Sequence, residues 1–386
     1  MRKFRDWLAA TLPSLLLVLI PSLAAPGQTT TTAHAKPPHA SPALSIEVSA
    51  GAIERIGKIV EVELETAQLP SSGEKALTLV EVNEQGGIVD RHVPFQLDQG
   101  EAANPPLLTF LLSGGTPAKA TRRFRLQRAT EAVPPLAPQV QVEEVAEYEG
   151  FPAFRITTPA ATYYYHVGGS GFASLIDREG HDWISHHPEG GFQGSYRGIP
   201  NVAPPEFHPG PGKGKKESRL IRSGPLRASI LSETEDGAWS VVWDIFPAYA
   251  NMTLLKKSAA PYWILYEGTP GGSFDTENDY WVQSTGKRLP VAPNDQDNFW
   301  EGTLPSPQWV YFGDEKLRRV LFLALREADD FPDEFWHRGS GSMTVFGFGR
   351  GPRPQWQYMQ TVPTHLTIGL VESSDFGEVK RRIESA

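Results

Sequence analysis

The chain has 386 residues, a formal net charge of −9, 40% hydrophobic residues and 21% charged residues. This composition is typical of a globular protein with a large core, and the acidic balance argues against a nucleic acid partner because phosphate binding relies on clustered Lys and Arg. Cysteine is absent, which excludes a disulfide framework and a thiolate metal site. A chain of this length can hold two domains.

The first 25 residues have the pattern of a secretory signal peptide. Arg2, Lys3 and Arg5 precede an apolar run over residues 8–23, and the run ends in small residues. An uncleaved N-terminal anchor is the alternative, although the run is short for a membrane span and contains two prolines. We therefore expect a periplasmic or extracellular protein with no stable membrane span once the signal is removed.

Residues 26–42 are rich in Thr, Pro and Ala and predict a low-complexity tether. Residues 43–129 then show short alternating strands separated by turn signals, which predicts a small immunoglobulin-like β-sandwich. The strands expected in this domain cover residues 44–48, 59–64, 76–82, 93–97, 107–112 and 120–126.

Residues 130–139 contain three prolines and no periodicity, so they predict a linker to a larger domain over residues 140–386. Helical periodicity is convincing only over residues 375–385, where Asp375 can cap the start. The strands expected in the larger domain cover residues 140–148, 151–157, 161–166, 172–177, 226–233, 239–246, 262–267, 309–312, 320–325, 342–349 and 365–371. This pattern predicts an all-β fold with two large antiparallel sheets packed face to face.

A loop of residues 186–208 interrupts the early strands of the larger domain. Long loops without secondary structure in compact domains are usually functional, and this loop gathers polar side chains among Pro and Gly. These side chains are His186, His187, Tyr196, Arg197, Asn201, Glu206 and His208. The loop is therefore the first candidate for a functional site.

A family resemblance is carried by residues 161–185, which read ATYYYHVGGSGFASLIDREGHDWIS. This succession of strands and Gly-containing turns resembles the opening of galactose mutarotase-like β-supersandwich domains, and the resemblance extends over residues 138–372. It implies a large antiparallel supersandwich of the kind that occurs in sugar epimerases, polysaccharide lyases and glycoside-acting enzymes. The chain is also similar to a group of secreted bacterial proteins with a small N-terminal β-sandwich, which implies no catalytic assignment.

Aromatic residues of the larger domain favour a carbohydrate partner, either a polymer or an oligosaccharide. Saccharides bind through aromatic platforms and planar polar groups, and tryptophan is concentrated in this part of the chain. Its tryptophans are Trp183, Trp239, Trp243, Trp263, Trp281, Trp300, Trp309, Trp336 and Trp356. Most of them are expected in the core, whereas Trp300 and Trp336 have polar neighbours in the sequence and are expected to line a cleft.

The first reaction hypothesis is β-elimination on a glycan that contains uronic acid. This reaction needs a base for the proton α to the carboxylate, an acid for the leaving oxygen, and groups that neutralise the developing enolate. His208 or His187 can act as the base, and Tyr196 can act as base or acid. Arg197 and Asn201 can bind the carboxylate and neutralise the developing charge. The structural alternative is that these side chains only fix the loop by hydrogen bonds.

The second hypothesis is hydrolysis, or sugar epimerisation, that uses Glu267 at the end of an apolar strand. Two carboxylates on either side of a glycosidic bond perform hydrolysis, and Glu206 or Asp244 can supply the second. Arg350 follows an aromatic strand and is expected to bind an anionic substrate as a lone cation. A non-catalytic carbohydrate-binding or surface role is the third alternative. We favour an enzyme because binding alone does not call for so many titratable groups in one loop.

The sequence predicts no cofactor. Histidines 186, 187 and 208 with Glu206 have the ligand types of a transition-metal site, but two adjacent imidazoles on an extended backbone point to opposite sides. The acidic runs at residues 275–279 and 294–298 carry oxygen ligands for calcium, yet they lack the twelve-residue loop with its terminal bidentate Glu. Solvated turns are the expected role of both runs.

Overall fold

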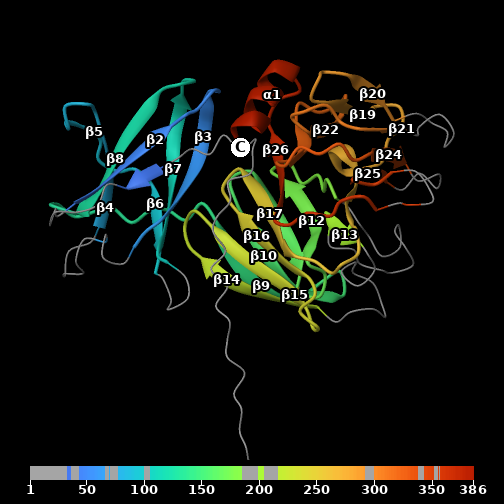
Figure 1. The fold of residues 1–386 in the computed structure, drawn as a ribbon, viewed down its shortest axis with the longest axis horizontal. Helices are drawn as coiled ribbons and strands as arrows, with labels where there is room; N and C mark the ends of the chain where they lie inside the picture. The colour runs from blue at the N-terminus through green and yellow to red at the C-terminus, as the bar shows by residue number, and fades with distance from the viewer. Residues whose placement is uncertain are drawn as a thin grey trace, which may run out of the picture.

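The computed structural model describes residues 33–35, 43–65, 69, 77–99, 105–184, 199–203, 216–291, 300–337, 343–351, 355 and 357–386. These residues form an all-β protein with one α-helix, as the sequence predicts. Figure 1 shows a small N-terminal β-sandwich beside a larger body of β-sheets. Every strand pairing in the described ranges is antiparallel.

The N-terminal sandwich packs a five-stranded sheet, β1-β2-β8-β4-β5, on a three-stranded sheet, β3-β7-β6. Its strands are β1 (Ala33–Ala35), β2 (Ala43–Ser49), β3 (Arg55–Glu63), β4 (Leu77–Val82), β5 (Ile88–Asp90), β6 (Phe95–Asp98), β7 (Leu107–Thr116) and β8 (Thr121–Arg128). Buried and exposed side chains alternate along β2. Its buried residues Leu44, Ile46 and Val48 lie in one core cluster with Phe110 and Phe124. Period-two burial of this kind places one face of each sheet inside the sandwich.

The strand β1 lies inside residues 26–42, the segment predicted as a low-complexity tether. It pairs with β2, with Ala33 opposite Val48 and Ala35 opposite Ile46. Without β1, the strand β2 would be an edge strand with unpaired backbone groups, and a segment of any composition can satisfy such groups. The predicted signal peptide over residues 1–25 lies outside the described residues.

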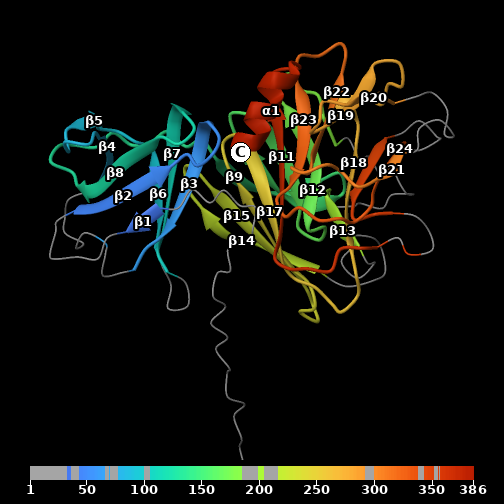
Figure 2. The ribbon, with the colours of Figure 1, turned by 45° about the horizontal axis from the view of Figure 1, so that its top comes forward.

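The larger domain contains three sheets rather than the two predicted. A four-stranded sheet has the order β12-β11-β10-β9, with β9 (Gln141–Tyr148), β10 (Phe151–Thr157), β11 (Ala161–His166) and β12 (Gly171–Asp177). A nine-stranded sheet, here called the large sheet, has the order β14-β15-β16-β17-β26-β23-β22-β19-β20. A five-stranded sheet, here called the distal sheet, has the order β13-β18-β25-β24-β21. It lies at the end of the molecule away from the N-terminal sandwich in both ribbon views (Figures 1 and 2).

The strands of the large sheet are β14 (Lys216–Ser223), β15 (Ala228–Thr234), β16 (Ser240–Ile245), β17 (Tyr249–Lys256), β19 (Asp279–Gln283), β20 (Arg288–Pro290), β22 (Trp309–Asp314), β23 (Val320–Leu325) and β26 (Thr364–Val371). Those of the distal sheet are β13 (Asn201–Ala203), β18 (Trp263–Gly268), β21 (Trp300–Gly302), β24 (Asp333–His337) and β25 (Thr344–Phe348). One core cluster joins all three sheets, because it contains Tyr163, Trp243, Ile368 and Phe346. Burial of aromatic and branched side chains here supplies most of the driving force for folding.

The helix α1 (Phe376–Ser385) begins where the sequence predicts. The Asp375 side chain accepts a hydrogen bond of 2.9 Å from the Glu378 amide, as an N-cap residue should. Val379 and Ile383 share one face and are buried against the large sheet and β3 in a second core cluster.

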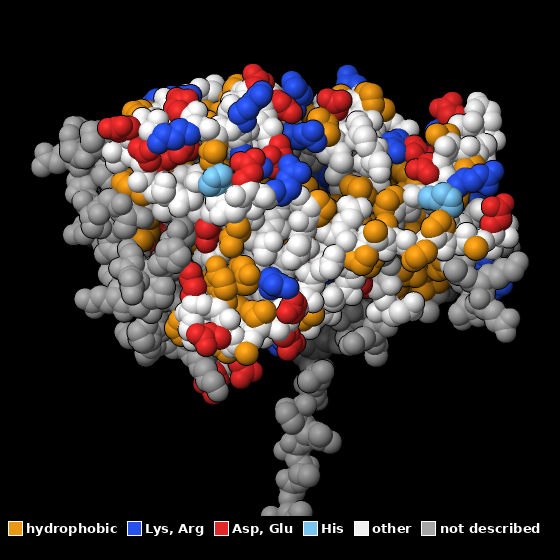
Figure 3. Space-filling model, turned by 180° about the vertical axis from the view of Figure 1, so that it is seen from behind, with side chains coloured by type: hydrophobic (Ala, Val, Ile, Leu, Met, Phe, Trp, Pro, Cys, Tyr) orange, Lys and Arg blue, Asp and Glu red, His pale blue; other side chains and the backbone are white. Residues whose placement is uncertain are grey.

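Among the described residues no helix is both long and apolar enough to cross a membrane. Figure 3 shows charges of both signs interspersed on one face, with no single-sign field over its described part.

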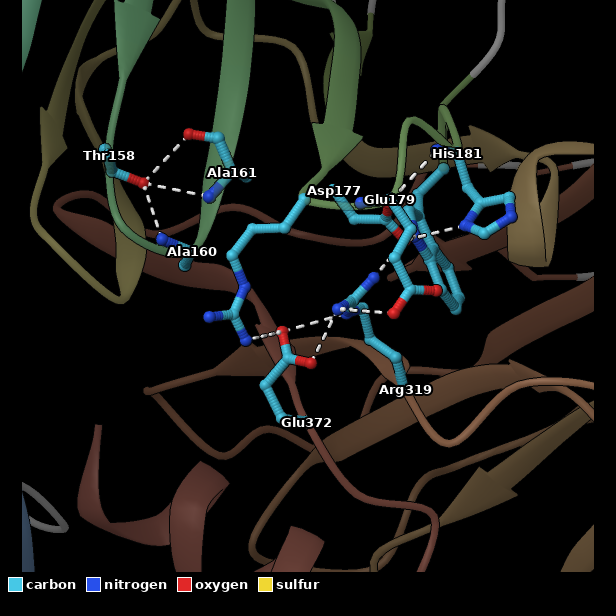
Figure 4. A network of polar contacts seen from close by, with 10 residues as sticks. Thr158, Ala160, Ala161, Asp177, Glu179, His181, Arg319 and Glu372 are labelled. Atoms are coloured by element: carbon cyan, nitrogen blue, oxygen red, sulfur yellow. Dashed lines mark hydrogen bonds and ion pairs between the residues drawn. The ribbon is translucent and has the colours of Figure 1, made fainter.

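A buried ion network fastens the end of β12 to the large sheet (Figure 4). Asp177 accepts hydrogen bonds from the Trp183 indole at 3.0 Å and from the Glu179 and His181 amides at 2.8 and 3.0 Å. Arg319 forms an ion pair with Asp177 and a bidentate pair with Glu372 at 2.8 and 2.6 Å. Burial acts to raise the pKa of Asp177, but the donors from Trp183, His181 and Arg319 outweigh it and lower this pKa to about 2.

Replacement of Asp177 by asparagine is expected to lower the free energy of unfolding by about 2 kcal/mol at pH 7, because each pKa unit corresponds to about 1.4 kcal/mol. The ionised carboxylate stabilises the fold fully above its ordinary pKa near 3.8, and this contribution is lost as the pH falls toward 2. Urea unfolding should therefore show a difference between wild type and Asp177→Asn that is largest at pH 7 and shrinks below pH 4. The exposed Asp330→Asn is the control, and equal loss in both variants would contradict the assignment.

Candidate functional site

The distal sheet has two faces, and the face away from the main core carries the candidate site. Opposite residues in an antiparallel pair share a face, and successive residues alternate. Leu265 lies opposite Asn201 and Gly347, and Glu267 lies opposite Val345. In turn, Gly347 lies opposite Glu334, and Val345 opposite Trp336. Here this set, together with Trp263 of β18, is called the outer face.

The other face of the distal sheet is apolar and belongs to the main core. It carries Ile264, Tyr266, Phe335, Phe346 and Phe348. Side chains on the outer face are buried as well: Trp263 is 9% exposed, Leu265 3% and Glu267 3%. A carboxylate at this depth must be held by polar partners or serve a function.

The guanidinium of Arg350 lies between two tryptophan rings on the outer face. Its central carbon is 5.7 Å from the Trp263 ring centroid and 5.2 Å from that of Trp336, distances at which cation–π attraction operates. Arg350 Nε is 2.9 Å from Glu334 Oε2, and both side chains are 12% exposed. This pairing corrects the prediction that Arg350 is a lone cation. The prediction failed because Glu334 lies on the neighbouring strand β24, and a local sequence pattern does not show which strands pair.

Two glycines and a buried acid hold Arg350 in this position. A Cβ on Gly347 would lie 2.7 Å from Arg350 Cβ, so only glycine lets the arginine lie across β25. Gly349 has φ of +59°, and its amide donates a 2.9 Å hydrogen bond to Asp333. Burial raises the pKa of Asp333 to about 7, against the opposing effect of the Gly349 and Leu304 amides that donate to it.

Asn201 lies opposite Leu265 at the β13 edge of the outer face, the face that also carries Glu267. It is 2% exposed, and neither atom of its side-chain amide has a hydrogen-bond partner in the described parts of the chain. A buried amide without partners costs free energy, so it is poised to bind a ligand group that both donates and accepts. Glu267 and Asn201 thus supply a carboxylate and an amide on the same face as the Trp263–Arg350–Trp336 stack.

The structure brings four predicted site residues to the same face, namely Asn201, Glu267, Trp336 and Arg350. Trp300 instead lies on the opposite face, 5.4 Å from the Trp281 ring and 6.5 Å from Phe346, so it packs toward the main core and away from this group. The candidate partner Asp244 is also elsewhere, on β16 of the large sheet with Ser229 and Arg227. The predictions for His187, Tyr196, Arg197, Glu206 and His208 fall on residues outside the described ranges.

Sequence reasoning missed Trp263 and Glu334 as site residues, although a signal for both exists. Trp263, Leu265 and Glu267 alternate along β18, and Glu334 and Trp336 alternate along β24. Period-two spacing places each set on one face. The pattern does not say which face turns away from the core, because that depends on the sheets packed against it.

For metals, the described residues contain no group of three or more His, Asp or Glu side chains placed to hold an ion. In the acidic run at 275–279, Asp275 forms an ion pair of 2.7 Å with Lys316 and accepts from the Asn278 side chain at 2.8 Å. These contacts use the Asp275 carboxylate to close a turn. The histidines proposed as ligands lie outside the described residues.

No family model matches the chain, and no curated protein sequence is similar to it. Among solved structures, a glycosyl hydrolase family 38 protein from Enterococcus faecalis matches 89% of this chain with 10% identity and a TM-score of 0.43. The chain spans about half the length of that protein, 47%. The Slr1438 protein from Synechocystis sp. PCC 6803 matches 64% of this chain over its whole length with 9% identity and a TM-score of 0.30. At these TM-scores neither likeness assigns a function to the chain.

Proposed function

We propose that this is a secreted, carbohydrate-active protein that holds a glycan on the outer face of the distal sheet. The observation that carries the proposal is the stack of Arg350 between Trp263 and Trp336, with Glu334 at 2.9 Å from the arginine and Glu267 and Asn201 alongside. Secretion rests on the signal-like pattern of the first 25 residues.

The chemistry of this face suits sugar hydroxyls. Tryptophan rings cover the C–H faces of a sugar, and an arginine paired with a glutamate offers donors and acceptors together without a large net charge. The Trp336 indole N–H is buried and has no acceptor in the described part of the chain, so it offers a further donor. An Arg–Glu pair is a weaker anchor for a carboxylate than a free arginine, so recognition of a uronate would depend on other groups.

The reaction we propose is β-elimination on a glycan that contains uronic acid. A base removes the proton α to the carboxylate, and the electron pair of that C–H bond forms the C=C bond of an unsaturated uronate. The C–O bond to the leaving saccharide breaks as an acid protonates its oxygen. The unpaired amide of Asn201 supports this reaction, because a buried donor at the carboxylate stabilises the charge of the enolate. The base would come from His187, Tyr196 or His208, as the sequence predicts.

Hydrolysis is the second candidate, favoured by the two buried carboxylates on one face. Glu267 and Glu334 come from strands on either side of β25, and both are less than 10% exposed. Such a pair can supply the acid and the base or nucleophile that hydrolysis needs. In this assignment Glu334, which is paired with Arg350, serves as the base or nucleophile and Glu267 as the acid.

The test incubates the full chain with uronate polymers and with neutral polysaccharides. Binding is followed by calorimetry, unsaturated uronate by absorbance at about 235 nm, and chain cleavage by new reducing ends. Binding with a rise in both signals on uronate polymers is the expected result. New reducing ends without the absorbance would replace elimination by hydrolysis, and binding without cleavage would leave a binding protein. Failure to bind any glycan would refute the proposal.

A further inference from the structure

A cavity of about 720 Å³ lies between the N-terminal sandwich and the large sheet, far from the outer face of the distal sheet. Its floor is formed by strands β16, β17, β26, β23 and β22, its roof by β3, and one side by the end of α1. Figure 1 shows α1 and the C-terminus beside β3 at this junction. Two hydrogen bonds join β3 to the end of α1 at this side of the cavity. Arg55 donates to the Glu384 carbonyl at 3.0 Å, and the Ile56 amide donates to Ser385 Oγ at 2.6 Å.

The floor of the cavity carries a row of polar residues across the middle of the large sheet. Asp244 lies opposite Asn251, Asn251 opposite Thr367, and beyond Ala324 the row ends at Trp309. Arg326 Nε donates to Thr367 Oγ1 at 2.9 Å, and Thr367 donates to Asn251 Oδ1 at 2.8 Å. The Trp309 indole N–H is buried and has no acceptor among the described residues. The contact between the two domains around the cavity is apolar. The presence of a row of buried polar residues beside it therefore requires a separate explanation, such as ligand binding.

Two cations in the cavity have no carboxylate partner among the described residues. The Lys58 ammonium lies 5.8 Å from the Tyr249 ring centroid, and the Arg326 side chain donates to Thr367. Burial lowers the pKa of Lys58 to about 7, with a further lowering by Arg326 and Arg55 that the charge of Glu61 partly opposes. Burial and the charge of Arg55 also lower the pKa of Arg326. Like charges gathered away from bulk water are unfavourable, and a bound anion would offset that cost.

Two acidic residues of the cavity, Glu61 and Asp244, pair with Arg227 rather than with Lys58 or Arg326, although the charge of Glu61 also acts on Lys58. Arg227 forms ion pairs with Glu61 and, at 2.7 Å, with Asp98. Asp244 accepts from Ser229 and lies 4.0 Å from Arg227. Lys58 and Arg326 are therefore the two cations of the cavity lining that are left without a direct ion pair in the described residues, and an anion could lie against both.

We propose that this cavity is a binding site for a small hydroxylated carboxylate, such as a sugar acid of one or two rings. The carboxylate would lie between Lys58 and Arg326, and the hydroxyls would bond to Asn251, Thr253 and the Trp309 indole N–H. The volume is within the range of sites that enclose small molecules. The proposal does not rest on the glycan-binding role of the outer face.

The test uses the full chain, with galacturonate as the ligand and galactose and sodium acetate as comparisons, in isothermal titration calorimetry. We expect galacturonate to bind, acetate to bind more weakly and galactose not to bind. Lys58→Met removes the charge but keeps the length of the side chain, and it should raise the Kd for galacturonate by at least about tenfold. Arg326→Gln is the second variant with the same expected loss, and Lys256→Met, at the exposed end of β17, is the matched control.

Thermal unfolding without ligand separates a binding role from a structural role. If Lys58 serves a ligand, its removal relieves repulsion, and the unliganded Lys58→Met protein should have an unchanged or higher Tm. A lowered Tm together with unchanged galacturonate affinity would overturn the proposal. Failure of galacturonate to bind, or equal binding of galactose, would also overturn it.

Discussion

Replacement of Arg227 by alanine is expected to lower the free energy of unfolding by about 3–5 kcal/mol, the cost of removing one partner from a buried ion cluster. Arg227 is 2% exposed and lies among Glu61, Asp98 and Asp244. Without the guanidinium, three partly buried carboxylates, with side chains 38%, 16% and 21% exposed, would face one another. Burial already raises the pKa values of Glu61 and Asp244, and these would rise further in the variant.

The position of Arg227 makes this a test of how the two domains are joined. Gln96 of the N-terminal sandwich accepts from the Leu226 and Arg227 amides at 3.0 Å each, so the ion cluster sits on a shared backbone contact. Urea unfolding at pH 7 measures the loss. Arg123→Ala is the matched control, because its pair with Glu47 at 2.9 Å is exposed and water screens it, so its loss should change the free energy of unfolding little. Equal losses in the two variants would refute the buried-cluster argument.

The second large effect is expected at the outer face of the distal sheet. Trp336→Ala removes one of the two rings that hold the Arg350 guanidinium and should weaken glycan binding by about 10–100-fold, which corresponds to an aromatic contact of roughly 1–3 kcal/mol. In this variant Arg350 would keep its ion pair with Glu334, but its guanidinium would no longer be held in one orientation between two rings. Calorimetry with the glycan that binds the wild-type chain measures the change.

A matched control for Trp336 is Phe151→Ala, because Phe151 is a large aromatic side chain on β10 with 40% of its surface exposed. That variant should bind glycan like the wild type. Near-ultraviolet circular dichroism confirms that both variants keep their packing. Glycan affinity that is unchanged in Trp336→Ala, with the fold intact, would remove the outer face from the proposed function.

Local sequence pattern predicts many elements of this fold well. The strands β10 (Phe151–Thr157), β11 (Ala161–His166) and β23 (Val320–Leu325) have the predicted bounds, and Asp375 caps α1. In each case the signal is within the segment: apolar residues between turn signals, or a capping side chain before a helical period. Such signals are independent of where the segment lies in the tertiary structure.

Several strands lack a signal of this kind. β13 (Asn201–Ala203) and β21 (Trp300–Gly302) are three residues long, and β1 lies in a segment that composition assigns to a tether. These strands form because a neighbouring strand offers unpaired backbone groups in register. The partner strand, rather than the segment's own residues, decides that they are strands.

The sequence by itself determined the all-β class, the alternation that gives each strand two faces, and the presence of tryptophans, carboxylates and arginines in the larger domain. Only the tertiary structure decided which of them meet. Arg350 is a lone cation in the sequence but lies against Glu334 and two tryptophans, while Trp300 turns to the core. The physical reason is that alternation defines two faces without saying which one is covered, and the covering sheets come from distant parts of the chain.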